Sequence, residues 1–89
     1  MSREHLRTAS DLLEDAAERT TDEPAERLRA FAERLDRMAG ADRDPDHGRL
    51  ATVLLKLEEI AGSVDGDVAV TIQEAREHVT EFRRTVEGV

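Results

Sequence analysis

The residues best placed to do chemistry form a short acidic stretch in the middle of the chain. Asp42, Asp44 and Asp46 alternate there with other residue types, as oxygen ligands do in the first half of an EF-hand calcium loop. The stretch departs from that loop, because His47 stands where a glycine makes the sharp turn and Val53 where a bidentate glutamate closes the site. Weak divalent-cation or small-ligand binding by the three aspartates is therefore one functional hypothesis, and a calcium sensor is not indicated.

The same stretch also fits the start of a helix. Asp44 is a suitable N-cap, Pro45 is tolerated at the first helical position, and Asp46 is favoured near the positive end of the helix dipole. This interpretation explains every residue of the stretch without a metal ion. We therefore assign no metal ligand and keep the three aspartates only as weak candidates.

The three histidines of the chain lie outside any recognisable catalytic or metal-binding pattern. A di-iron bundle needs a glutamate three residues before a histidine, whereas Ala75 stands three residues before His78 and Glu74 four before it. The sequences around His5 and His47 differ from those of phosphorylated histidines in phosphotransfer proteins. We interpret all three as solvated side chains on helices.

Other catalytic arrangements are absent from the sequence. The chain has no cysteine, which excludes disulfides, zinc–thiolate sites and thiol catalysis. It has no Gly-x-Ser-x-Gly elbow and no glycine-rich phosphate loop. Its carboxylates are expected on solvent faces, where they are not tuned for acid–base work. The sequence therefore predicts a protein that is not an enzyme and has no cofactor.

Four segments with helical periodicity must position all of these residues. They cover residues of about 3–19, 24–39, 45–61 and 66–87. The links between them are short, so neighbouring helices must run antiparallel. The sequence predicts a single domain over residues 1–89, an all-α antiparallel four-helix bundle with up-down-up-down topology. An alternative is an intertwined dimer in which helical hairpins from two chains complete one bundle.

Each segment carries one apolar stripe, and the four stripes form the predicted core. These residues are Leu6, Ala9, Leu13, Ala16 and Thr20, then Leu28, Phe31, Leu35 and Met38, then Leu50, Val53, Leu54, Leu57, Ile60 and Ala61, and finally Val68, Ile72, Ala75, Val79, Phe82 and Val86. Leu55 and Val70 lie off their stripes. We expect these two residues to be exposed and to be candidates for contact with a second copy or a partner.

The ends of the segments follow from capping residues and helix breakers. Ser2 is placed to cap the first segment, Pro24 is expected to open the second, and Gly40 and Gly62 to end the second and third.

The start of the fourth segment is ambiguous. Asp65 or Asp67 could cap it, but Thr71 and Glu74 also form a capping box further along. The β-branched run 68–72 leaves an extended conformation open as an alternative.

The charge of the chain excludes several partners. It carries 21 acidic and 13 basic residues, for a net charge of −8, and two phenylalanines are its only aromatic side chains. Such a surface is not suited to phosphate backbones or anionic lipid. The longest apolar run, 50–55, is too short to span a bilayer, and no signal peptide is evident. We expect a cytoplasmic protein with no nucleic-acid or membrane partner.

The balance of basic residues indicates the solvent in which the protein works. Lys56 is the single lysine beside twelve arginines, and an acidic surface with little lysine is suited to concentrated salt. An ordinary acidic protein from an arginine-rich genome is the alternative. In length, composition and Ala/Leu helical patterning, the chain resembles small, functionally uncharacterised helical proteins of haloarchaea. That resemblance covers the whole chain and implies a lineage but no activity.

Charge is also distributed unevenly along the chain. Residues 1–23 have a net charge of −4, whereas residues 24–45 are balanced. This asymmetry could orient self-association, with the first helix of one subunit facing the second helix of another. Pairing within the second segment, such as Arg29 with Glu33, is the alternative explanation.

The sequence thus favours a non-enzymatic helical interaction or scaffold module adapted to high salt. Its partner is expected to be a protein or a second copy of itself in a homodimer. A weak cation-binding or ligand-binding protein that uses the loop from Asp42 to Asp46 is the alternative function.

Overall fold

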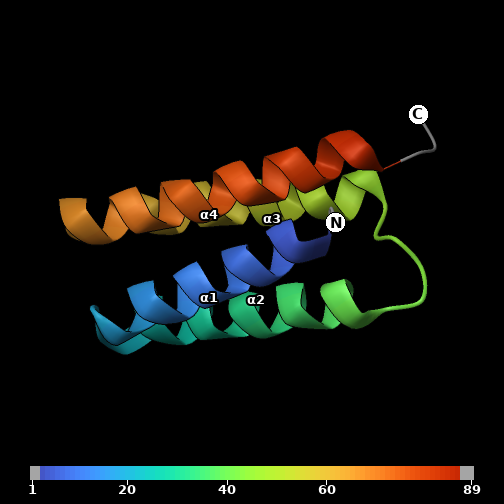
Figure 1. Ribbon diagram of the computed structural model, residues 1–89. Helices are drawn as coiled ribbons and strands as arrows, with labels where there is room; N and C mark the ends of the chain where they lie inside the picture. The colour runs from blue at the N-terminus through green and yellow to red at the C-terminus, as the bar shows by residue number, and fades with distance from the viewer. Residues whose placement is uncertain (1–2, 87–89) are drawn as a thin grey trace.

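The computed structural model describes residues 3–86. It contains four helices, α1 (Arg3–Glu18), α2 (Asp22–Gly40), α3 (His47–Ala61) and α4 (Gly66–Thr85), and no strand within the described residues (Figure 1). The all-α prediction is confirmed, and the extended alternative for residues 68–72 is wrong. None of the described helices is both long enough and apolar enough to cross a membrane.

The helices lie side by side as antiparallel rods in a bundle of 36 × 20 × 18 Å (Figure 1). Helix α1 packs against α2 and α4, and α3 packs against α4. Helices α2 and α3 are also neighbours, but their backbones approach within 8 Å at far fewer positions than in the other pairs. Helix α4 therefore lies diagonally across the bundle from α2. One chain closes the bundle without a second chain.

The predicted stripes form the core with few exceptions. The largest fully buried side chains are Phe82, Leu6, Leu13, Leu28, Leu35, Leu50, Leu57, Ile60, Ile72, Val53, Val68 and Val79. Phe31, Leu54 and Thr20 are half-buried at the edges. Ser10 and Thr71 are the buried polar residues among those described, and the Ser10 hydroxyl donates to the carbonyl of Ala32 at 2.7 Å. The described interior therefore holds no charged side chain.

The start of α3 differs from the prediction. The helix begins at His47 rather than at residue 45, and Asp46, not Asp44, is its N-cap. The Asp46 carboxylate accepts the backbone N–H of Arg49 at 2.7 Å, so it satisfies one of the donors that a helix start leaves free. Pro45 lies before the helix with its side chain buried, in the position of a hydrophobic staple.

The other boundaries agree with the prediction to within about two residues. Helix α2 begins at Asp22, so Pro24 lies inside the first turn instead of opening it. Asp65 is the N-cap of α4, and the capping box at Thr71 does not start the helix. Helix α1 ends at Glu18 and α4 at Thr85. The predicted cap at residue 2 and the predicted end at residue 87 lie outside the described residues.

Candidate functional site

Two carboxylates of the acidic loop before α3 have structural roles. Asp44 Oδ1 accepts a hydrogen bond from Arg3 Nη2 at 2.8 Å, and Asp46 caps α3. Among residues 3–86, no three His, Cys, Asp or Glu side chains gather where they could hold a metal ion. The structure therefore does not bring Asp42 together with the other two candidates around a common point.

Arg3 connects this loop to α1 and to the end of α2 through hydrogen bonds. One nitrogen of its guanidinium, Nη1, donates to the carbonyls of Met38, Ala39 and Ala41 at the end of α2, while Nη2 binds Asp44. A positive group at a helix C-terminus satisfies carbonyls that have no partner within the helix. Nothing in the sequence indicated this role, because Arg3 lies more than thirty residues from its partners.

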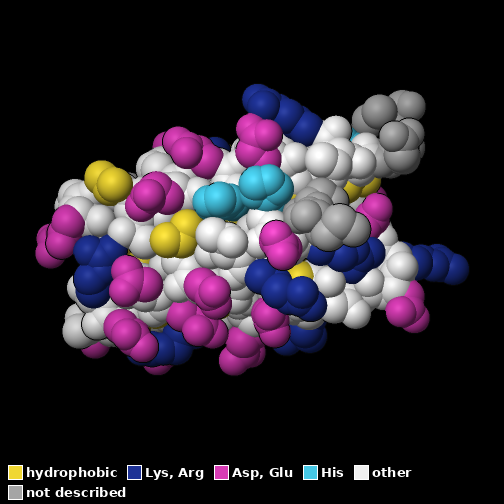
Figure 2. All heavy atoms as spheres, viewed as in Figure 1, with side chains coloured by type: hydrophobic (Ala, Val, Ile, Leu, Met, Phe, Trp, Pro, Cys, Tyr) yellow, Lys and Arg dark blue, Asp and Glu magenta, His cyan; other side chains and the backbone are white. Residues whose placement is uncertain are grey.

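Two of the histidines meet between α1 and α4. The Nδ1 atoms of His5 and His78 are 2.9 Å apart, and their ring centroids are 5.2 Å apart; Figure 2 shows histidine side chains together on this face. One Nδ1 must carry a proton and the other a lone pair for this hydrogen bond to form. Both side chains are half-buried, so they remain partly exposed and also contact each other between α1 and α4.

An open hollow of about 430 Å³ adjoins this pair. It is lined by His5, Gln73, Arg76, Glu77, His78, Thr80, Glu81 and Arg84. Its two arginines already have partners. Arg76 donates to the carbonyl of Leu54 at 3.1 Å and pairs with Glu58 at 3.0 Å, and Arg84 pairs with Glu81 at 2.7 Å. The hollow therefore offers an anionic ligand no arginine that lacks an acidic partner.

The third histidine, His47, contacts the end of α4. Arg83 Nε donates to His47 Nδ1 at 3.2 Å, so that nitrogen is unprotonated. The proton of the neutral ring then lies on Nε2, which is 3.2 Å from the carbonyl oxygen of Val86 and donates to it. This tautomer is assigned from the hydrogen bonds. His47 thus joins the first turn of α3 to the last turn of α4 as a structural residue.

Leu55 and Val70 are the large hydrophobic side chains that the described structure leaves in solvent. Leu55 on α3 is 60% exposed and Val70 on α4 is 61% exposed. The sequence predicted this exposure correctly.

The basic residues of the four helices differ in how they are paired. Arg3 of α1, Arg76 and Arg84 of α4, and Arg19, which directly follows α1, each bind a carboxylate. The arginines of α2 form no ion pair with a described residue, so the expected pairing within that helix is not formed. They are Arg27, Arg29, Arg34 and Arg37. Arg7 of α1, Arg49 of α3 and Arg83 of α4 also form no ion pair with a described residue, so basic residues without an acidic partner occur on all four helices.

A known protein family covers almost the whole chain. Residues 1–85 match the model of a family described as a family of unknown function (DUF7553). No curated protein and no solved structure matches the chain.

Proposed function

Because the chain belongs to this family of unknown function, we propose from its surface that it is a non-enzymatic helical interaction module adapted to concentrated salt, and that it acts by contact with further copies of itself. The observation that carries the proposal is the exposure of two large apolar side chains on neighbouring helices of a bundle whose core is already closed. Leu55 and Val70 add nothing to that core, since each is more than half exposed.

Two further features support a role in binding rather than catalysis. Two of the three aspartates proposed as a cation site are engaged, Asp44 with Arg3 and Asp46 with the start of α3. The histidines are engaged with each other or with the end of α4. Potential reactive groups are thus used to hold helices together, and the apolar residues on the surface are left for recognition.

Replacing Leu55 or Val70 with glutamate should weaken self-association. In molar potassium chloride, sedimentation equilibrium of the unmodified protein should give an average mass that rises with concentration. Leu55→Glu and Val70→Glu should each shift that rise to higher concentration, by about threefold to tenfold, because a charge replaces apolar area at the contact.

Ala30→Glu is the matched control, because Ala30 is an exposed apolar residue on α2 that lies outside the proposed contact. This variant should associate as the unmodified protein does. A protein that remains monomeric at every concentration would contradict the proposal.

Stability should increase with salt. Six carboxylates form ion pairs with described residues, and these are Asp15, Asp44, Glu58, Glu59, Asp67 and Glu81, while the net charge is −8. Salt screens repulsion among the remaining acidic groups. Urea unfolding followed by circular dichroism should therefore give a higher midpoint as potassium chloride rises from millimolar to molar. Sucrose of equal osmolality is the control. Full stability in dilute buffer would argue against adaptation to salt.

A further inference from the structure

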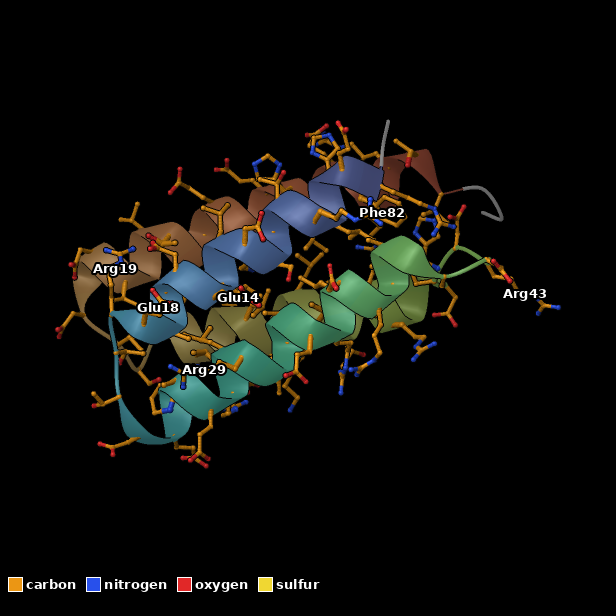
Figure 3. All side chains as sticks on the ribbon, turned by 60° about the horizontal axis from the view of Figure 1, so that its bottom comes forward. Glu14, Glu18, Arg19, Arg29, Arg43 and Phe82 are labelled. Carbon is orange, nitrogen blue, oxygen red and sulfur yellow. The ribbon has the colours of Figure 1, made fainter. Side chains whose placement is uncertain are left out.

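The first turn of α1 contacts a different neighbour on each side. Arg3 donates to carbonyls at the end of α2 and binds Asp44 of the loop that follows. His5 comes two residues later and contacts His78 of α4. Figure 3 shows this loop, from which Arg43 projects, at the end of the bundle where α1 begins. This turn therefore links α4 on one side to α2 and the loop on the other.

The two histidine rings face each other along a nearly straight line. Their Nδ1 atoms are 2.9 Å apart and their centroids 5.2 Å apart, and the difference between these distances is about twice the radius of an imidazole ring. A straight line of this kind is the arrangement that a hydrogen bond prefers. A metal ion on the same line would need about 4 Å between the two nitrogens. The geometry is therefore that of a shared proton.

The number of protons on the pair decides whether this hydrogen bond can exist. With both rings neutral, one Nδ1 donates and the other accepts. When one ring is charged, it still donates to the neutral ring, and the hydrogen bond becomes charge-assisted. When both rings are charged, both Nδ1 atoms carry protons and no acceptor is left. Two positive rings then repel each other across 2.9 Å in a half-buried position.

Charged side chains of both helices surround the pair. On α4 they are Glu74, Arg76, Glu77, Glu81 and Arg84, and on α1 they are Glu4 and Arg7. Glu81 pairs with Arg84, and among the described residues no glutamate of α4 forms an ion pair with either ring. Attraction from these glutamates therefore acts over a longer distance than the repulsion within the pair, and it is weaker for that reason.

We propose that the first turn of α1 is a pH-sensitive switch. It is held to α4 while the His5–His78 pair carries at most one positive charge, and its opening becomes easier when both rings are charged. Opening of this turn also breaks the contacts of Arg3 with α2 and with Asp44. The switch does not use Leu55 or Val70, so it is independent of the proposed self-association.

The direction of the pH effect follows from the number of protons bound. In the open or unfolded chain the two rings are far apart and each takes up a proton near about pH 6.5, as ordinary histidines do. The closed pair accepts the second proton less readily, because that proton removes the hydrogen bond. The open state therefore binds more protons as the pH falls, and the closed turn loses stability in the same direction.

Amide hydrogen exchange at Arg7 tests the proposal, because in a helix its N–H bonds to the carbonyl of Arg3. The protein for this test carries His47→Gln, so that the pair supplies its only histidines. Protection of the Arg7 amide, relative to an unfolded chain at the same pH, should fall by about threefold to tenfold between about pH 7.5 and 5.5. Carboxylates stay ionised over this range.

The matched controls add His78→Gln or His5→Gln to the same protein. A glutamine amide can donate or accept but gains no charge, so protection in either control should change by less than about twofold over the same range. Nitrogen NMR of the protein with both histidines should also show, at about pH 7.5, a proton on Nδ1 of one ring and on Nε2 of the other.

Two results would overturn the switch. One is an equal loss of protection at Arg7 with and without the second histidine. The other is a spectrum in which neither Nδ1 carries a proton at the higher pH, since the rings would then share no hydrogen bond.

Discussion

Replacing Phe82 with alanine is expected to lower the free energy of unfolding by about 3–5 kcal/mol. The ring is the largest fully buried side chain and is 1% exposed. Its removal takes away buried apolar area and leaves a cavity that four packed helices cannot close completely. A domain of 89 residues has a total stability of about 4–13 kcal/mol. Urea unfolding at constant salt should therefore show a large loss, or a variant that is largely unfolded.

Phe31→Ala is the matched control for this prediction. Phe31 is the second aromatic side chain of the protein, and it is half-buried at the edge of the core. Its loss should cost about 1–2 kcal/mol, because part of its surface already contacts water. Equal losses for the two variants would show that Phe82 does not occupy the centre of the core.

Replacing Arg3 with alanine should cost about 2–3 kcal/mol, which is large for a residue at the edge of a helix. The guanidinium is 30% exposed and binds Asp44 at 2.8 Å, and it also donates to three carbonyls at the end of α2. Hydrogen bonds to charged groups are stronger than neutral ones. Their loss also frees the loop between α2 and α3. Urea unfolding gives the stability, and hydrogen exchange of residues 41–46 should be faster.

Three variants separate the contributions of these contacts. Arg3→Lys should lose less than alanine, because an ammonium keeps the charge but cannot reproduce the planar fork. Asp44→Asn should lose less than Arg3→Ala, since the carbonyl contacts remain. Arg7→Ala, which removes an exposed arginine one turn further along α1, should change stability by less than about 0.5 kcal/mol. A similarly small change for Arg3→Ala would mean that the contacts of Arg3 with Asp44 and with the end of α2 add nothing to stability.

Local periodicity was sufficient to predict the helices and nearly all of the core. The line from Val68 through Ile72, Ala75, Val79 and Phe82 is buried throughout, because residues three and four apart share one face of a helix whatever they pack against. Exposure of Leu55 and Val70 followed from the same argument. These are properties of a single helix, so they can be worked out before its neighbours are known.

The start of α3 was predicted less well for a reason outside the local sequence. Both Asp44 and Asp46 are good capping residues. The choice between them accompanies the contact of Asp44 with Arg3, a residue 41 positions earlier in the chain. A capping rule that considers only neighbouring residues cannot include a contact with Arg3.

The sequence alone determined four amphipathic helices, their antiparallel order, an uncharged interior and the two apolar residues in solvent, because each depends on helix geometry and on short links. Only the tertiary structure decided that His5 meets His78 and that Arg3 holds the end of α2. Those pairings depend on the rotation of each helix about its axis and on which helices become neighbours. Packing of the whole core sets both, and no single segment contains that information.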